Sequence, residues 1–192
     1  RGIPDELKKE ALTESEKAVE RIYSLLENLL EWSATHTDEI KPRKEKNMLF
    51  DIVAEGVSVL ETAAKNKNIT IEVTGENSEV ETDLYMLATV IRNITSNSIK
   101  FTQRGGKITI SAHRENAILH LRIADNGVGM DSEKIRKLFK LDERIASAGT
   151  GGERGGGFGL KLCNELIRMN GGSITVSSRP GEWTEVNIEL RL

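Results

Sequence analysis

A stripe of amide and ammonium side chains is the feature of this sequence best suited to chemistry. Asn93, Asn97 and Lys100 stand at i, i+4 and i+7. On a helix they fall within about 60° of one another. Amide oxygens suit Mg²⁺, which proteins usually hold jointly with phosphates, and a lysine suits phosphate oxygens. Such a stripe alone is more often ordinary surface, so it indicates a magnesium–nucleotide site only together with companions.

The first companion is the segment Asp-Asn-Gly-Val-Gly-Met, which begins at Asp125 directly after an apolar run. A carboxylate at the end of a buried strand would lie on a pocket floor, where it can accept a hydrogen bond from an exocyclic amine. Gly127 and Gly129 would let the backbone approach a ligand closely. The alternative is a plain turn, which Asp-Asn-Gly favours by itself. The second glycine and the helix expected after Met130 argue against an ordinary hairpin.

The second companion is a glycine-rich stretch over residues 149–159, which holds seven of the chain's 17 glycines. It runs directly into an expected helix, and backbone amides at a helix N-terminus form an anion site. A flexible linker is the alternative. Because the stretch lies between two expected helices of one domain, a lid over a ligand is favoured. No Gly-Lys-Ser/Thr closes it, so it is not a Walker loop.

The first element expected to support this chemistry is a long amphipathic helix over residues 5–36. Its apolar seam consists of Leu12, Val19, Ile22, Leu26 and Leu29. The spacings of seven, three, four and three are typical of a helical bundle. The helix could pack on its own domain or form one arm of a dimeric bundle. The breadth of the stripe, widened by Trp32, favours the arm.

Between this helix and the glycine-rich stretch the pattern predicts alternating strands and helices. We expect a strand over 48–50, a helix over 51–65, a strand over 69–73 and a helix over 83–101. Thr82 is a plausible N-cap for the last helix.

A strand pair follows, in which apolar and polar residues alternate. The apolar positions are Ile108, Ile110 and Ala112, then Leu119, Leu121 and Ile123. If Glu115 and Asn116 form a two-residue loop, these residues pair in reverse order, from Ala112 with Leu119 to Ile108 with Ile123.

Helices over 132–139 and 159–169 and strands over 173–178 and 184–190 complete the expected elements. Their order predicts an α+β fold, namely a two-layer α/β sandwich. Its mixed, mainly antiparallel sheet would carry helices on one face, and the long bundle helix would precede it. We expect residues 1–40 to form the helical segment and linker, and residues 41–192 the main domain.

Composition excludes several classes of function. The net charge of −3 and the lack of a basic stripe give no case for nucleic-acid binding. No apolar run approaches the ~20 residues of a membrane span, and no signal peptide opens the chain. The single cysteine, Cys163, rules out an internal disulfide and fits a reducing, cytoplasmic compartment. It is expected to be a packed thiol. Because the chain begins at Arg1 without methionine, we expect it to be cut from a longer protein.

The three motifs, in this order, resemble the N, G1 and G2 boxes of the catalytic ATP-binding domain of sensor histidine kinases. The matching patterns are Asn-x3-Asn-x2-Lys-Phe-Thr, Asp-Asn-Gly-x-Gly-Met and Gly-x-Gly-x-Gly-Leu. That domain belongs to the Bergerat-fold ATPases, which also include gyrase and heat-shock chaperone ATPases. Leu138-Phe139 is similar to the kinase F box, and residues 25–33 are similar to the second helix of the kinase dimerisation hairpin.

The resemblance implies ATP and Mg²⁺ as ligands and assigns roles to individual residues. Asn97 would be the magnesium ligand, Lys100 a phosphate contact and Asp125 the adenine anchor. The implied ATP-binding residues are Asn93, Asn97, Lys100, Phe101, Asp125, Gly127, Gly129, Met130, Thr150, Gly155, Gly157, Phe158, Gly159 and Leu160. Gly156 and Phe158 depart from the family pattern, in which Thr and Leu are more usual.

A kinase of this family phosphorylates a histidine that is followed by an acidic residue and a proline. None of His36, His113 and His120 fits this pattern, and the predicted register places His120 opposite Ser111. The chain would therefore start in the hairpin turn, around residues 2–7, without the acceptor helix. The resemblance also implies a homodimer of the parent protein and a response-regulator receiver domain as partner. The rivals are a non-catalytic nucleotide-binding scaffold and a conformational ATPase of the gyrase or chaperone type.

Overall fold

The computed structural model describes residues 41–138, 149–151 and 159–191. All of them belong to one compact unit, Lys41–Leu192. The helix expected over 5–36 lies outside the described residues, as do the residues 139–148 and 152–158. The expected division into a helical segment and a main domain therefore stays a prediction.

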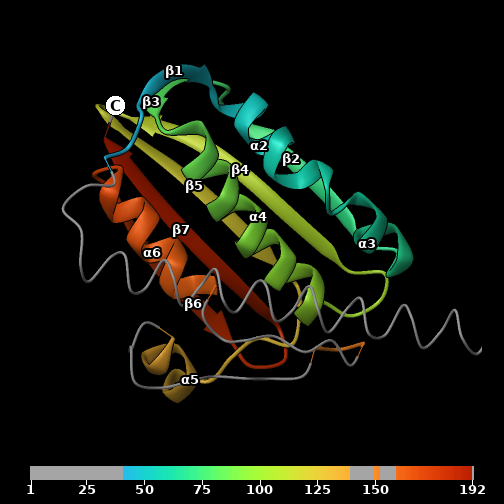
Figure 1. The fold of residues 1–192 in the computed structure, drawn as a ribbon. Helices are drawn as coiled ribbons and strands as arrows, with labels where there is room; N and C mark the ends of the chain where they lie inside the picture. The colour runs from blue at the N-terminus through green and yellow to red at the C-terminus, as the bar shows by residue number, and fades with distance from the viewer. Residues whose placement is uncertain (1–40, 139–148, 152–158, 192) are drawn as a thin grey trace, which may run out of the picture. The chain divides into compact units, whose positions relative to one another are not determined.

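A five-stranded sheet forms one layer of this unit, with the strand order β2-β4-β5-β7-β6 (Figure 1). The strands are β2 (Thr70–Gly75), β4 (Lys107–Glu115), β5 (Ile118–Asp125), β6 (Ser173–Arg179) and β7 (Trp183–Arg191). Only β2 and β4 run parallel, and the three other pairs are antiparallel. The predicted mixed, mainly antiparallel sheet is confirmed.

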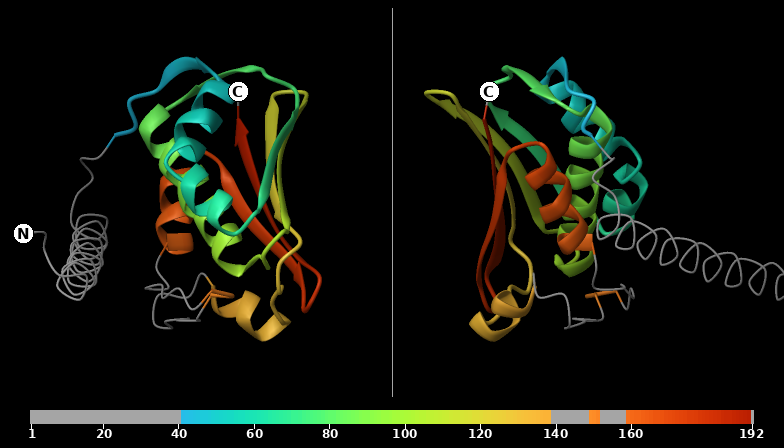
Figure 2. Two further views of the ribbon diagram at one scale, coloured as in Figure 1. Left: turned by 90° about the vertical axis from the view of Figure 1, so that its right-hand side faces the viewer. Right: turned by 60° about the vertical axis from the view of Figure 1, so that its left-hand side comes forward.

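Helices cover one face of the sheet, and the two layers are seen edge-on in Figure 2. The covering helices are α2 (Leu49–Ser58), α4 (Leu84–Phe101) and α6 (Gly159–Met169), with α4 packed between the other two. Apolar and polar residues alternate along β4 and β5, so each strand turns one face to the helices and one to solvent. The two-layer α/β sandwich with helices on one face is thus confirmed.

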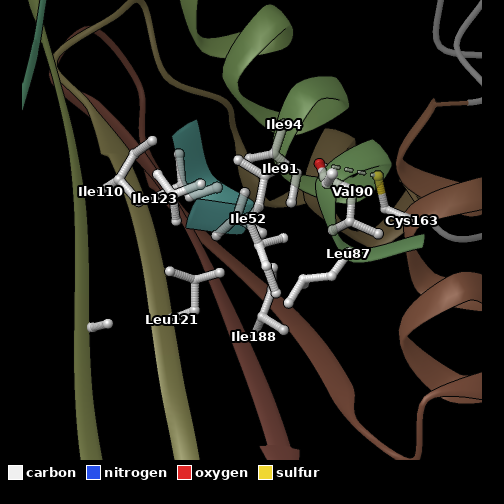
Figure 3. Close-up of a cluster of buried hydrophobic side chains, with 14 of the residues drawn as sticks. Ile52, Leu87, Val90, Ile91, Ile94, Ile110, Leu121, Ile123, Cys163 and Ile188 are labelled. Carbon is white, nitrogen blue, oxygen red and sulfur yellow. Dashed lines mark hydrogen bonds between the residues drawn. The ribbon is translucent and has the colours of Figure 1, made fainter. Parts of the chain in front are cut away.

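The core lies between α4 and the inner face of the sheet (Figure 3). Leu87 and Ile91 of α4 and Leu121 and Ile188 of the sheet are at most 1% exposed. Cys163 of α6 is fully buried, and its Sγ lies 3.8 Å from the Val90 carbonyl oxygen. Burial raises the pKa of this thiol to about 12. Cys163 is therefore the packed, unreactive thiol that the sequence predicts.

The region before α4 differs from the sequence-based expectation. The strand predicted over 48–50 is wrong: β1 (Glu45–Met48) ends where α2 begins. The helix predicted over 51–65 is two helices, α2 and α3 (Glu61–Asn66). β1 instead pairs with a strand that the sequence reasoning missed, β3 (Glu79–Thr82), in a separate two-stranded sheet.

Helix α4 begins one residue later than predicted, and Thr82 is not its cap. The cap is Asp83, whose carboxylate accepts a hydrogen bond of 3.0 Å from the Met86 amide. Thr82 ends β3 instead and donates its hydroxyl to the Asn170 side chain at 2.9 Å. Asn170 also accepts from the Asp83 amide. This buried asparagine thus joins the end of α6 to the start of α4.

The register predicted for the β4–β5 hairpin is wrong by two residues. Ala112 lies opposite Leu121, Ile110 opposite Ile123, and the loop is Asn116 and Ala117. Asn116 adopts a φ of +55°, which asparagine tolerates in tight hairpin loops. Because a shift of two residues keeps every side chain on its own face, both registers bury the same apolar set.

The same difference in register changes the cross-strand partner of His120. The structure places it opposite His113 and not opposite Ser111. Both histidines lie on the outer face of the sheet, as predicted.

The last elements agree closely with expectation. Helix α6 and the strands β6 and β7 match their predicted ranges within a residue or two. The helix predicted over 132–139 is observed as α5 (Ser132–Lys137), capped by Asp131. Among the described helices, none combines the length and apolar character that a membrane crossing needs.

Candidate nucleotide-binding site

Asp125 is the last residue of β5, and its carboxylate is directed toward α4. It is 6% exposed. One oxygen, Oδ2, accepts a hydrogen bond of 2.8 Å from the Ser98 hydroxyl. The other, Oδ1, accepts one of 3.0 Å from the Gly127 amide. The carboxylate is therefore fixed in orientation. It has about four acceptor positions, and the Thr184 backbone is a third donor, so about one position remains for a ligand.

The electrostatics of this carboxylate are set mainly by burial. Burial raises the pKa of Asp125 above its ordinary value, because the charged form loses hydration. Hydrogen bonds from Ser98 and from the backbone of Gly127 and Thr184 favour the charged form and oppose the shift. Thr184 lies directly opposite Asp125 on β7. A desolvated carboxylate held by three donors is well placed to accept a hydrogen bond from a ligand amine.

The amide stripe of α4 faces the start of α6. Asn93 and Asn97 are half-buried, and the Asn93 amide donates to the Thr89 carbonyl at 3.1 Å. That bond leaves Oδ1 of Asn93 directed at Gly159, where a Cβ atom would lie 3.3 Å from it. The same Cβ would lie 4.0 Å from Nδ2 of Asn97. Two amide side chains therefore meet the first residue of α6, at the positive end of that helix.

The C-terminal end of α4 is a second meeting point. The Thr150 amide donates to the Lys100 carbonyl at 3.0 Å, and the Thr150 hydroxyl lies 2.8 Å from the Thr102 carbonyl. Thr150 thus fixes the start of the glycine-rich stretch to this helix. The Lys100 ammonium lies 4.7 Å from the centroid of the half-buried Phe101 ring, a cation–π distance.

Lys67, from the turn between α3 and β2, completes this end of the helix. Its ammonium donates to the Ile99 carbonyl at 2.7 Å, the Lys100 carbonyl at 3.1 Å and the Thr150 hydroxyl at 2.7 Å. A cation among the last carbonyls of a helix is favoured by the helix dipole. Lys67 could not be identified from the sequence, because its partners lie 32 to 83 residues away along the chain.

Replacing Lys67 by Met should lower the free energy of unfolding by about 1–2 kcal/mol, because the helix end loses its cation and the hydrogen bonds. The matched control is Lys65→Met, which breaks only an exposed i,i+4 ion pair with Glu61, worth about 0.3–0.5 kcal/mol. Urea unfolding of both variants makes the comparison. Equal losses would contradict the assigned role.

The loop after Asp125 is held between α4 and the β6–β7 hairpin. The Val128 amide donates to the Phe101 carbonyl at 3.1 Å, and the Val128 carbonyl accepts from the Gly181 amide at 2.7 Å. The Met130 amide donates to the Ser178 hydroxyl at 2.8 Å. These bonds hold the backbone close to Asp125.

The two glycines of this loop are required by close contacts. A Cβ at Gly127 would lie 2.6 Å from the Phe101 carbonyl oxygen and 2.7 Å from Oδ1 of Asp125. Gly129 has a φ of +62°, and a Cβ there would lie 1.9 Å from the Arg179 carbonyl oxygen. Both positions therefore exclude side chains through contacts within the domain, and the close approach to a ligand stays a prediction.

We expect Gly129→Ala to destabilise the domain more than Gly105→Ala. Gly105 has a similar φ of +80° but nothing within 4 Å of an added Cβ. Its replacement carries only the backbone strain of about 1–2 kcal/mol. Gly129→Ala adds a clash with fixed backbone, worth about another 1–3 kcal/mol. Thermal unfolding of both variants tests this, and indistinguishable midpoints would contradict it.

Most of the predicted site residues meet around the C-terminal half of α4. Asn93, Asn97, Lys100 and Phe101 lie on the helix itself, and the residues that contact it are Asp125, Gly127, Thr150 and Gly159. Gly129 and Met130 contact the β6–β7 hairpin instead, and Leu160 follows Gly159 in α6. Gly155, Gly157 and Phe158 lie outside the described residues.

The site can accommodate two chemically different parts of a ligand. The amide oxygens, an ammonium and a helix N-terminus suit a phosphate chain and the Mg²⁺ that accompanies it. The buried carboxylate and the glycine backbone suit a flat, amine-bearing ring. The donor set therefore fits a magnesium-bound purine nucleotide.

Comparison with protein families agrees with this geometry. Residues 82–192 match the family described as histidine kinase-, DNA gyrase B- and HSP90-like ATPase. The match spans α4, the whole site and the four C-terminal strands of the large sheet.

Curated relatives include histidine kinases. The histidine protein kinase DivJ of Caulobacter vibrioides is 36% identical over 112 residues, which is 58% of this chain and 19% of DivJ. The adaptive-response sensory kinase SasA of Prochlorococcus marinus is 31% identical over 170 residues, or 86% of this chain and 44% of SasA. The chain thus spans less than half the length of either relative.

Solved structures show the same fold. The histidine kinase AdeS of Acinetobacter baumannii has a TM-score of 0.75 at 21% identity, covering 99% of this chain and 86% of AdeS. The catalytic domain of histidine kinase ThkA has a TM-score of 0.67 at 22% identity, covering 78% of this chain and 95% of that domain. The chain therefore belongs to the histidine kinase-, DNA gyrase B- and HSP90-like ATPase family.

Proposed function

We propose that residues 41–192 bind Mg-ATP around α4 and transfer the γ-phosphate to a histidine, for signalling to a response regulator. One observation carries the proposal. The buried Asp125 carboxylate is bonded to Ser98, the neighbour of Asn97, while Asn97 itself faces the first residue of α6. The proposed adenine anchor on β5 and the proposed phosphate-binding end of α6 thus both lie against α4, which carries the proposed metal ligand.

The adenine end of the site is proposed at Asp125. Its remaining acceptor position would receive the exocyclic amine of the base, and Gly127 and Gly129 would leave room for the ring. Met130 and Phe101 would contact the ring from either side of the loop. The hydrogen bonds from Ser98 and Gly127 hold the carboxylate ready, so little reorganisation accompanies binding.

The phosphate end is proposed along the amide stripe. Asn97 would hold Mg²⁺, Asn93 would be its polar neighbour, and Lys100 would contact phosphate oxygens. Thr150, Gly159 and Leu160 would lie along the triphosphate at the start of α6. The resemblance to sensor histidine kinases places Gly155, Gly157 and Phe158 along the triphosphate as well. Bound Mg²⁺ would neutralise phosphate charge, and these residues would contribute by positioning the γ-phosphate for in-line attack.

The phosphoacceptor is proposed to be a histidine other than the three of this chain. His113 and His120 lie on the outer face of the sheet, opposite the face that carries α4. Strand β5 separates His120 from Asp125 by five residues, or about 17 Å. His36 lacks the acidic residue and proline of the acceptor motif.

The wider assembly is part of the same proposal. Residues 1–40 would form the second helix of a dimerisation hairpin and a linker, through which the parent protein forms a homodimer. The receiver domain of a response regulator would take the phosphate. One structural relative is the histidine kinase ThkA in complex with the response regulator TrrA, with a TM-score of 0.74 and 21% identity. A cytoplasmic location, where ATP is available, completes the proposal.

The test separates binding from transfer. Calorimetric titration of the chain with Mg-ATP should show binding at one site. Incubation with γ-labelled ATP should leave the chain itself unlabelled. A histidine-bearing dimerisation hairpin, added as a separate polypeptide, should become labelled with an acid-labile phosphate. A hairpin with the histidine replaced by glutamine is the matched control.

Three outcomes would contradict parts of the proposal. No binding at millimolar Mg-ATP would overturn the site. Acid-labile phosphate on the chain alone would overturn the assignment of an outside acceptor. Binding without any transfer to the hairpin would favour a non-catalytic nucleotide-binding module.

A further inference from the structure

A row of ionisable side chains crosses the outer face of the large sheet, away from the nucleotide site. His113 of β4 lies directly opposite His120 of β5, and His120 lies directly opposite Glu189 of β7. The two imidazole rings are stacked, with centroids 4.7 Å apart and planes 7° from parallel. The row lies near the end of the sheet that holds the C-terminus (Figure 1).

A second carboxylate joins the row from the β4 strand. Glu115 stands two residues beyond His113 and therefore on the same face. The ligand atoms that His113, Glu115 and His120 can offer all lie within 4.8 Å of one another. No other group of three such side chains is found in the described ranges 41–138, 149–151 and 159–191.

The two nitrogens of His120 face different carboxylates. Nε2 lies 4.0 Å from Glu115, and Nδ1 lies 3.6 Å from Glu189. This is the arrangement in which one ring nitrogen can bind a metal while the other donates to a supporting carboxylate. The strand register explains why each nitrogen of His120 faces a different carboxylate. Glu115 lies on β4 and Glu189 on β7, the two strands that flank His120 on β5.

We propose that His113, His120 and Glu115 form a zinc site on the outer face of the sheet, with Glu189 orienting His120. Two imidazoles and one carboxylate are a ligand set that Zn²⁺ takes in proteins, with a fourth position for water. Mg²⁺, which prefers oxygen ligands, is a poor match. Ligand atoms bound to one tetrahedral Zn²⁺ lie about 3.3 Å apart, so the present separations of up to 4.8 Å require rotation of the side chains. Their exposure permits this: 26% of the His120 side chain and 70% of the Glu115 side chain are accessible.

The ion would fasten the two strands of the β4–β5 hairpin near its loop. Because Zn²⁺ would bind the folded hairpin and not the unfolded chain, it should raise the unfolding temperature. The site is independent of the nucleotide site, which lies on the other face of the sheet and at the other end of β5.

The test is titration of the full chain with zinc chloride. We expect one equivalent to bind and the unfolding temperature to rise with zinc concentration. His113→Gln and His120→Gln should each weaken zinc affinity by about tenfold or more. His36→Gln is the matched control and should leave the affinity unchanged. Circular dichroism and Mg-ATP affinity of His113→Gln and His120→Gln should equal those of the wild-type protein, because these two side chains lie on the outer face of the sheet, away from the core and the nucleotide site.

Nuclear magnetic resonance of the imidazole nitrogens provides an independent measurement. Zinc should shift the ring resonances of His113 and His120 but not those of His36. Retention of wild-type zinc affinity by both His113→Gln and His120→Gln would overturn the proposal. It would equally be overturned if zinc failed to shift those two rings or to raise the unfolding temperature.

Discussion

Replacing Asp125 by Asn should remove most of the chain's affinity for ATP. In the wild-type protein both carboxylate oxygens accept hydrogen bonds, and an acceptor position remains for a ligand. In the variant, the Gly127 amide keeps its hydrogen bond to the one side-chain oxygen that remains. The NH₂ group of the asparagine then faces the ligand amine, and two donors cannot form a hydrogen bond. A hydrogen bond to a charged group contributes about 1.5–3 kcal/mol, so affinity should fall by about 10- to 150-fold. Calorimetric titration with Mg-ATP measures the change.

The control for this variant is Asp51→Asn, which neutralises an exposed carboxylate in the first turn of α2. It changes the net charge by the same amount and should leave ATP affinity unaltered. Equal affinity of Asp125→Asn and the wild-type protein would contradict the assignment of Asp125 as the adenine anchor.

The same variant should be more stable than the wild-type protein at neutral pH. Burial raises the pKa of Asp125 in the folded state, so the folded protein binds this proton more tightly than the unfolded chain. Stability therefore falls as pH rises through the folded-state pKa, and the penalty is complete above it. Asparagine avoids the penalty, and the Ser98 hydroxyl can accept from its NH₂ group. The stabilisation should shrink as unfolding is measured at pH values falling toward the ordinary pKa of aspartate.

Replacing Asn97 by Ala should remove the effect of Mg²⁺ on nucleotide affinity. The variant deletes the amide that faces the start of α6, whereas the Asp125–Ser98 contact stays in place. Loss of a group that supports a metal site lowers metal affinity by about 10- to 100-fold, and loss of a direct ligand should lower it at least as much. Titrations of a non-hydrolysable ATP analogue, with Mg²⁺ and with chelator, separate the metal-dependent part.

Ser96→Ala is the matched control for Asn97→Ala. Ser96 is the preceding residue of α4 but is exposed, so its replacement should preserve the magnesium effect. If Asn97→Ala kept the wild-type ratio of affinities with and without Mg²⁺, the assignment of Asn97 as a metal ligand would fail.

The sequence predicted the long, strongly patterned elements better than the short ones. Helix α4 and strands β4 to β7 have enough apolar positions to fix their period. The three apolar residues at 48–50 are too few to distinguish strand from helix, and the structure begins α2 at Leu49. Strand β3 was missed because Val80 is its only apolar residue, and its pairing with β1 is visible only in the fold.

Candidate site residues could be named from the sequence where a motif is local, but not where a contact is long-range. The amide stripe and the glycines of the Asp125 loop are readable from spacing alone. Ser98 was missed because its partner lies 27 residues away, and Asn170 because its hydroxyl donor, Thr82, lies 88 away. The hairpin register was ambiguous for a different reason. Two pairings that differ by two residues bury the same side chains, and Asn116 lies in the two-residue loop of both.

The most direct test of the central claim is a crystal structure of the chain with Mg²⁺ and a non-hydrolysable ATP analogue. We predict that the exocyclic amine of adenine lies within hydrogen-bonding distance of Asp125. The ion should bind Oδ1 of Asn97, and the phosphates should lie between Lys100 and Gly159. A nucleotide bound elsewhere, or one whose base contacts neither Asp125 nor the glycine loop, would contradict the claim that these groups form one site.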